Sequence, residues 1–232
     1  MAEYTSVSML ERLGKLINRI QRIRSAIPVD MQRGDARHVA LSGIQTTLGP
    51  LMLALGALEH ANQTIPNIEL TRLCGFKNQS NEILLSYFDT WAKLNLLVFT
   101  QFRVEHLLYD LLAAFDSNYN HRTGFQKKVT DLFDRVNVLD RGKKADCFKV
   151  MALLRNSLHS NSVNRNGDHD ILLFGVRFVF QNNKPTTATM PNILHVIEHA
   201  IEIVAEIVVH PTITALPAPI ENRFQVEIGR FG

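Results

Sequence analysis

The amino-acid sequence predicts a mostly α-helical protein, a helical bundle with a small β-hairpin before the C-terminal helix. Apolar residues recur at the helical period of 3.6 over most of the chain. Only the stretch at 170–181 combines β-branched and aromatic residues with a period of two. The 232 residues are 46% hydrophobic and 20% charged, a composition typical of a globular chain with a sizeable core.

Composition also limits the compartment and the class of partner. The formal charge is +3 and the pI is near 9.0, which permits a polyanionic partner without requiring one. Cys74 and Cys147 lie in apolar contexts and form no Cys-x-x-Cys pair, so reduced, buried thiols are expected. The sequence does not begin with a basic region and an apolar run, so we expect no signal peptide and a cytoplasmic location.

The first 77 residues are expected to form a helical segment that packs on the main domain or serves oligomerisation. Residues 6–26 predict an amphipathic helix that ends near Pro28, and 29–38 predict a loop. Residues 39–58 carry no charge and reach the length of a membrane span. Their Pro50 and several Gly, Ser and Thr residues instead favour one or two buried helices over 39–62, broken near Gly49.

A connector over 63–80, with a short helix at 68–74, is expected to lead into the main domain at 78–210. The run 81–116 contains no Gly or Pro and predicts a long helix at the centre of the bundle. A polar loop at 116–124, a helix at 125–138 and a turn at 140–144 are expected next.

The hairpin and the last helix complete the predicted domain. A strand at 170–181, a turn at 182–185 and a second strand at 186–190 would form the hairpin. Residues 191–209 predict the last helix, and 211–232 predict an extended, proline-containing tail.

One amphipathic helix, predicted over 145–162, carries the main candidate site. Cys147, Met151, Leu154 and Leu158 recur at steps of four, three and four, so they share its buried face. Arg155 and His159 are four residues apart, which places them one turn from each other on the flank of that face. A cation and an imidazole are costly to desolvate there unless they have a partner or a function.

The run Arg155-Asn156-Ser157-Leu158-His159 resembles the signature of the HEPN domains (higher eukaryotes and prokaryotes nucleotide-binding). That signature is an Arg, a polar residue that is often Asn, and a His near a helix end. Three residues separate Arg155 from His159, whereas four to six are usual. The run is similar to a subset, Arg-Asn-Ser/Thr-x-His-Asn-Asn, that is followed by a short strand pair. The resemblance covers about residues 80–210 and implies an α-helical domain, which in many members is a metal-independent ribonuclease.

The resemblance also implies roles for these side chains. Arg155 would hold the scissile phosphate, His159 would act as acid or base, and Asn156 would orient a phosphate or the partner His, with Glu105 as a further orienting group. Because one imidazole does not serve readily as both acid and base, two protomers would form a composite site in a homodimer. The ligand or substrate would be RNA, the product a 2′,3′-cyclic phosphate, and no cofactor would be needed. Such proteins act in defence or as toxins, with a protein antitoxin as partner.

Two alternatives use the same residues differently. Arg155 and His159 would be favoured by the helix dipole at a C-terminus, which fits a non-catalytic helical interaction module. Separately, His195, Glu198 and His199 spell the His-x-x-Glu-His motif of a zinc hydrolase, with His195 and His199 as metal ligands. The same residues also form the narrow polar stripe of an apolar helix, so the motif alone does not require zinc. His121 and His169 lie in polar loops and are expected at the surface.

Overall fold

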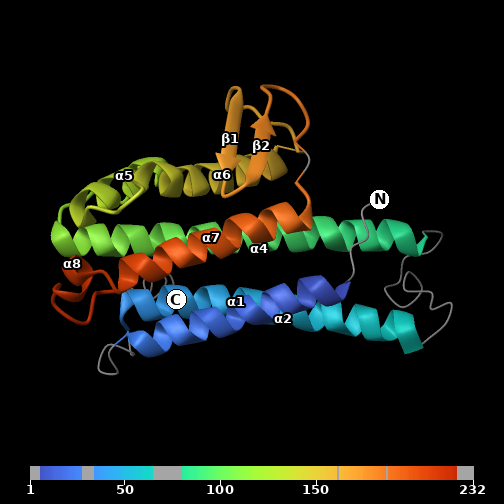
Figure 1. Cartoon of the computed structure of the whole chain (residues 1–232), viewed down its shortest axis with the longest axis horizontal. Coiled ribbons are helices and arrows are strands. Elements are labelled where there is room, and N and C mark those ends of the chain that lie inside the picture. The colour runs from blue at the N-terminus through green and yellow to red at the C-terminus, as the bar shows by residue number, and fades with distance from the viewer. Residues whose placement is uncertain (1–5, 28–33, 65–79, 161, 187, 224–232) are drawn as a thin grey trace, which may run out of the picture.

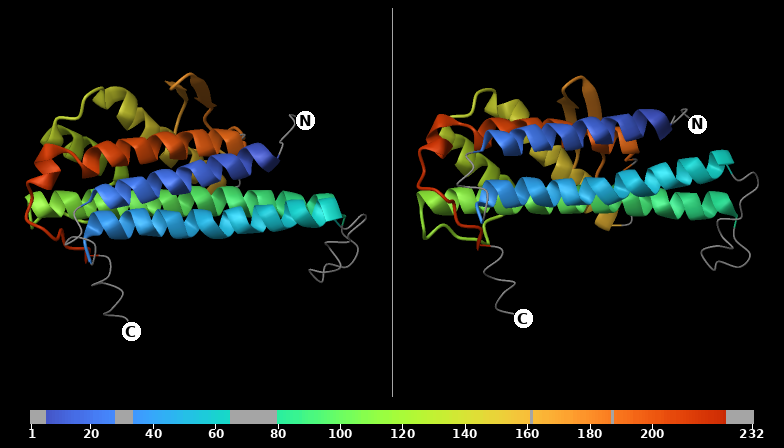
Figure 2. Two further views of the ribbon diagram at one scale, coloured as in Figure 1. Left: turned by 60° about the horizontal axis from the view of Figure 1, so that its bottom comes forward. Right: turned by 90° about the horizontal axis from the view of Figure 1, so that it is seen from below.

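Four long helices form a bundle in the computed structural model, which describes residues 6–27, 34–64, 80–160, 162–186 and 188–223. They are α1 (Ser6–Ala26), α2 (Ala36–Thr64), α4 (Asn81–Phe115) and α7 (Met190–Val208). Contacts run round a ring, because α1 packs on α2 and α7, and α4 packs on the same two helices (Figure 2). The bundle confirms the predicted fold class.

A second layer covers one side of this bundle. It consists of α5 (Phe125–Val136), α6 (Arg141–His159) and a hairpin of β1 (His169–Leu173) and β2 (Val176–Phe180), as Figure 1 shows. The helix α6 packs on both α4 and α7, and β1 packs on α6. This layer therefore fixes the end of α6 and the hairpin against the central helices.

The helix α4 is the centre of the molecule, as its apolar sequence predicts. It contacts α2, α5, α6 and α7 along its 35 residues. Its first turn is capped by Ser80, whose hydroxyl accepts a hydrogen bond from the backbone N–H of Ile83. The predicted stripe is the core face only in part, because its Leu108, Leu111 and Leu112 are buried whereas its Tyr87, Trp91 and Phe102 are exposed. The buried face also includes Leu96, Leu97 and Leu107, which the predicted stripe left out.

The predicted break in α2 is wrong, because the helix runs without interruption from Ala36 to Thr64 with Pro50 inside it. Pro50 is exposed, so the helical hydrogen bond that its missing N–H would make is lost next to solvent rather than in the core. Packing of α2 on α1 and α4 outweighs that loss. By length and composition alone Ala36–Leu58 is apolar enough to cross a membrane, a test that core helices also pass.

Two further element boundaries differ from the prediction. The turn predicted at 140–144 belongs to α6, which begins at Arg141 after Asp140 in a left-handed conformation. Residues 36–38, predicted as loop, are the first turn of α2. In the predicted extended tail, Pro211–Thr214 form a short helix, α8. The predicted Pro28 stop and the helix at 68–74 lie outside the described residues.

The hairpin lies at a different place from the one predicted. Residues predicted as one strand fold back on themselves, with His169 opposite Phe180 and Leu173 opposite Val176. The turn is Phe174-Gly175, both at positive φ (45° and 88°), as a two-residue hairpin turn requires. No strand follows in the described part of 186–190, and α7 begins at Met190.

One hydrophobic core joins the N-terminal helices to the rest. Leu13, Ile20, Leu41 and Ile44 belong to the same buried cluster as Leu108 and the α6 and α7 residues. The described part of residues 1–77 therefore packs directly on the region that the HEPN resemblance covers.

A buried ion pair ties the start of α2 to the C-terminal segment. Asp35 and Arg37 have side chains that are 0% and 1% exposed, and they pair at 2.9 Å. Asp35 Oδ1 also accepts from the backbone N–H of Arg37, which caps α2. Its Oδ2 accepts from the backbone N–H of Ile220 at 3.0 Å, so one carboxylate holds two distant segments together.

Candidate functional site

The candidate site lies at the C-terminal end of α6, where the helix passes into the hairpin. Cys147, Met151 and Leu154 are buried and Leu158 is partly buried, which confirms the predicted face. Burial raises the pKa of the Cys147 thiol to about 12, so this cysteine is an inert core residue, as expected. The apolar face fixes the rotation of α6 and therefore the direction of its last turn.

Arg155 is half-buried and its guanidinium is held by its neighbour. Arg155 Nη1 donates a hydrogen bond to Asn156 Oδ1 at 2.8 Å. Nε is buried and has no hydrogen-bond partner among the described residues. No carboxylate within the described part of the chain forms an ion pair with this arginine. Partial burial of a guanidinium without a carboxylate costs desolvation free energy. Since only Nη1 donates to a described residue, the remaining N–H groups of Arg155 have no acceptor there.

His159 is the last residue of α6 and is exposed. The helix ends at Ser160, whose backbone N–H bonds the carbonyls of Asn156 and Ser157. Ser157 is buried and its hydroxyl bonds the carbonyl of Leu153 at 2.8 Å, so it turns away from the site. The imidazole therefore faces solvent or a partner, one turn beyond the guanidinium.

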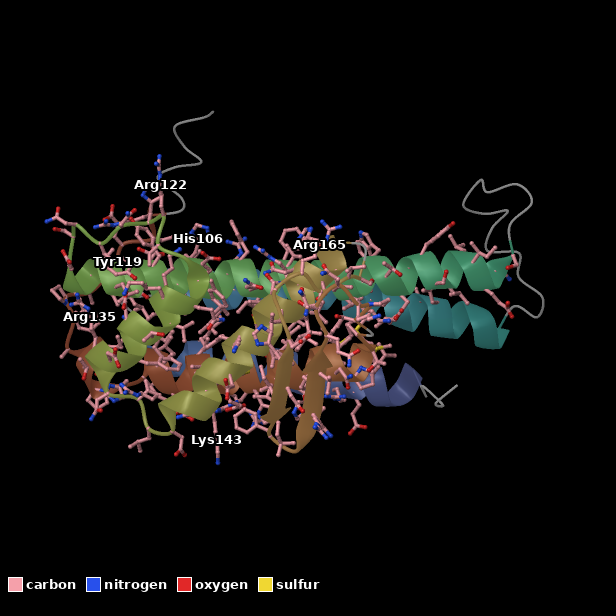
Figure 3. All side chains as sticks on the ribbon, turned by 90° about the horizontal axis from the view of Figure 1, so that it is seen from above. His106, Tyr119, Arg122, Arg135, Lys143 and Arg165 are labelled. Carbon is pink, nitrogen blue, oxygen red and sulfur yellow. The ribbon has the colours of Figure 1, made fainter. Side chains whose placement is uncertain are left out.

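The loop after His159 is held by a buried asparagine. Asn164 is 0% exposed, and its side chain bonds the carbonyl of Gly167 at 2.6 Å and the backbone N–H of Asn166 at 3.0 Å. Its backbone N–H bonds the carbonyl of Lys184, which joins the loop to the segment after β2. Arg165, exposed on this loop, adds a cation near the end of α6 (Figure 3).

Glu105 does not accompany the α6 residues. Its Oε1 accepts a hydrogen bond from Lys128 Nζ at 2.8 Å, in a cleft between α4 and α5. The structure brings Arg155, Asn156 and His159 to one helix end but assigns Glu105 to a different polar cluster. A single protomer therefore offers one imidazole and one guanidinium at this end of α6.

His195, Glu198 and His199 lie close together on α7, but each contacts a protein group of the hairpin or of α1. His195 Nε2 lies 3.1 Å from the carbonyl of Leu173, and Glu198 takes a two-pronged hydrogen bond from Arg12. The His199 ring stacks on Phe174, with centroids 3.9 Å apart. Among the described residues no group of three His, Cys, Asp or Glu side chains is arranged to hold a metal ion. The motif serves the packing of the hairpin on α7 and of α1 on α7.

Sequence patterns on α4 gave a signal that the prediction did not use. Phe102, Glu105, His106 and Tyr109 follow steps of three, one and three, so they share one outward face of α4. The prediction treated His106 only as a charge that interrupts the apolar run, and it assigned Glu105 to the α6 site as an orienting group. The structure joins this face to Lys128 of α5 in a defined cleft.

No protein-family model matches the chain, no curated protein is similar to it, and no solved structure matches it.

Proposed function

We propose that the protein is a HEPN-like, metal-independent endoribonuclease that acts as a homodimer, with the end of α6 as its site. The observation that carries the proposal is the half-buried Arg155, which pairs with no carboxylate among the described residues and lies one turn from an exposed His159. A phosphodiester supplies the missing anion, because a guanidinium binds phosphate oxygens through charge-assisted hydrogen bonds.

The remaining roles follow from the positions of the side chains. The bond from Nη1 to Asn156 orients the guanidinium and leaves Nη2 for the phosphate. An exposed imidazole next to a bound phosphate can take a proton from the ribose 2′-hydroxyl or return one to the leaving oxygen. Since one protomer provides one such imidazole at this site, a second α6 end supplies the other. The proposed product is a 2′,3′-cyclic phosphate, and the proposed location is the cytoplasm.

Cleavage of RNA in the presence of EDTA tests the chemistry. We expect the wild type to cleave and His159→Ala to lower the rate about 100-fold or more, the usual contribution of a general acid or base. Arg155→Gln should also lose activity, because a neutral amide does not offset the phosphate charge. The matched control is His169→Ala, a histidine ten residues later whose ring bonds only the local loop.

Three outcomes would contradict the proposal or redirect it. Intact RNA with the wild type at high enzyme concentration would remove the nuclease function. Equal activity of His159→Ala and His169→Ala would move the chemistry elsewhere. Activity that EDTA abolishes together with stoichiometric zinc that His195→Ala removes would favour the metal hydrolase.

The dimer is tested by the dependence of rate on enzyme concentration. With a composite site, the rate per protomer should fall on dilution below the dimer dissociation constant, measured by sedimentation. A constant rate per protomer in a sample that sediments as a monomer would contradict the two-protomer site.

A non-catalytic interaction module is the second candidate, and exposed apolar side chains favour it. Leu53 of α2 and Tyr87 and Trp91 of α4 are 75%, 55% and 53% exposed. The ends of α2 and α4 near residues 64 and 81 reach beyond the other helices (Figure 2). Large exposed apolar groups that lie near one another mark interaction surfaces. An antitoxin or another protein partner would bind there, and this candidate gains if RNA is neither cleaved nor bound.

A further inference from the structure

A second polar site lies away from the end of α6, between α4 and α5. One wall is the outward face of α4, formed by Phe102, Glu105, His106 and Tyr109. His121 of the loop after α4, Lys128 of α5 and Arg223 of the C-terminal segment complete it. We call this hollow, of about 210 Å³, the α4–α5 cleft. Four separate parts of the chain contribute polar side chains to it.

The floor of the cleft is a buried ion pair. The Lys128 side chain is 6% exposed, and its Nζ donates to Glu105 Oε1 at 2.8 Å. Glu105 is its one hydrogen-bond acceptor among the described residues, and the ammonium group also lies over the Tyr109 ring, 6.0 Å from the ring centroid. The floor therefore presents an anionic acceptor and a cationic donor side by side, which match the polar edge of a nucleobase.

The walls of the cleft are aromatic. The rings of Phe102 and His106 meet edge to face, with centroids 4.4 Å apart. On the other side the rings of Tyr109 and His121 meet edge to face at 6.4 Å. Aromatic side chains provide faces on which a base can stack, and such stacking contributes strongly to nucleotide binding.

The parts of the cleft that come from loops are held in place. Tyr119 donates its hydroxyl to Asp131 Oδ2 at 2.8 Å, which anchors the loop that carries His121. Burial and this bond raise the pKa of Tyr119 to about 12. A hydrogen bond that the Arg223 guanidinium donates to Tyr109 raises the pKa of Arg223. Arg223 also pairs with Glu221 at 3.3 Å and donates from Nη1 to the carbonyl of Ser117 at 3.5 Å. The cleft is therefore formed before any ligand enters.

We propose that the α4–α5 cleft binds one nucleotide, with the base between the aromatic walls and the phosphate at Arg223. The Arg223 side chain is 30% exposed and Lys128 is 6% exposed, so the arginine stands nearer the mouth and the lysine at the floor. A hollow of about 210 Å³ is below the usual size for drug-like ligands and suits one base rather than two. The nucleotide is free in solution or belongs to a single-stranded RNA, in which case the inference rests on the proposed function.

The cleft differs from the larger hollow between α1 and α7. That hollow, about 450 Å³, is lined by four cations, but Arg12 and Arg19 are bonded in pairs of hydrogen bonds to Glu198 and Glu202. These two arginines join α1 to α7, and Lys15 pairs with Glu11 on α1 itself. The α4–α5 cleft differs in its lining, because Phe102 and Tyr109 contribute to it, whereas no Phe, Tyr or Trp among the described residues lines the hollow between α1 and α7.

Calorimetric titration with three probes tests the proposal. AMP carries base and phosphate, adenosine the base alone, and ribose 5-phosphate the phosphate alone. We expect AMP to bind most tightly. His121→Ala should weaken AMP and adenosine about fivefold or more, the effect of removing one stacking face. Arg223→Gln should weaken AMP and ribose 5-phosphate but leave adenosine unchanged.

The controls use two residues that do not line the cleft. Arg122→Gln, on the same loop as His121, and His169→Ala should bind AMP like the wild type (Figure 3 labels Arg122). No binding of AMP at millimolar concentration would overturn the proposal. So would AMP affinities that are equal in the wild type, His121→Ala and Arg223→Gln while thermal melting shows all three folded.

A single-stranded oligoadenylate, titrated into His159→Ala so that it stays intact, identifies the source of the nucleotide. If the oligoadenylate binds more tightly than AMP, and if Arg223→Gln weakens that binding, the cleft binds RNA. Binding no tighter than AMP assigns it to a free nucleotide. AMP binding that persists while the wild type leaves RNA intact would remove the proposed nuclease and leave the cleft standing.

Discussion

At the scale of single residues, the sequence identified His195 and His199 as a pair but could not give their partners. Burial, and then the nearness of His195, lowers the pKa of His199 below its usual value of 6.5. Burial and the nearby Arg24 lower the pKa of His38 in the same way. Folding therefore favours the neutral form of both histidines, and both link folding to pH.

The sign of that link is fixed by the lowered pKa values. Below pH 6.5 the unfolded chain binds protons that the folded chain resists, so stability falls as the pH falls toward the folded pKa. We expect a lower melting temperature at pH 5.5 than at pH 7.5. His199→Phe keeps a ring to stack on Phe174 but does not titrate, so its melting temperature should depend less on pH. Identical pH dependence in wild type and variant would contradict this assignment.

The candidate catalytic residues were accessible from sequence because helical spacing fixes neighbours on one helix. The helical period placed Arg155 and His159 one turn apart, and the resemblance to the HEPN signature added Asn156. The α4–α5 cleft was not accessible, because His121, Lys128 and Arg223 reach it from three other segments. Long-range contacts of this kind leave no periodic signal, and only the α4 wall could have been suspected from the sequence.

At the scale of elements, the hairpin shows how a tertiary contact overrides a local pattern. The alternation at Val176, Phe178 and Phe180 indicated a strand, and β2 has it. The turn was missed because a phenylalanine at positive φ is unusual. In the structure Phe174 is stacked on His199 of α7, a contact that stabilises this conformation and is invisible in the local sequence.

The uninterrupted helix α2, for which the sequence predicted a break near Pro50, allows a test of what this proline costs. Pro50→Ala restores the N–H that a continuous helix needs, at an exposed position, so we expect it to stabilise the protein by about 1–3 kcal/mol. Gly49→Ala is the matched control, because a Cβ there meets nothing within 4 Å and only helix propensity changes, by about 1 kcal/mol. Urea unfolding measures both. If Pro50→Ala is no more stable than Gly49→Ala, Pro50 does not destabilise α2 and this explanation of the continuous helix is wrong.

At the scale of the whole molecule, the buried Asp35 joins the bundle to its C-terminal segment. Asp35→Ala leaves the buried Arg37 without this carboxylate and removes the cap of α2 and the bond to Ile220. We expect a loss of about 3–5 kcal/mol in the free energy of unfolding. The control is Asp170→Ala, which breaks the exposed pair with Arg177 and should change the free energy of unfolding far less than Asp35→Ala does.

The same variant connects the fold to the proposed nucleotide site. Ile220 lies three residues before Arg223, so releasing it should weaken AMP binding while the α6 site keeps its geometry. Equal losses of stability in Asp35→Ala and Asp170→Ala would contradict the role given to the buried pair.

The single tryptophan has a consequence for spectroscopy. Trp91 is 53% exposed on α4 and lines a groove between α4 and α2. It lies 18 residues before Tyr109 of the α4–α5 cleft on the same helix. Its emission therefore reports the solvent exposure of the outer ends of α2 and α4 and not the state of the core. A partner that covers those ends will shift the emission to shorter wavelength, whereas AMP in the cleft will leave it unchanged. One fluorophore thus distinguishes, without any label, the proposed binding of a protein partner from the proposed binding of a nucleotide.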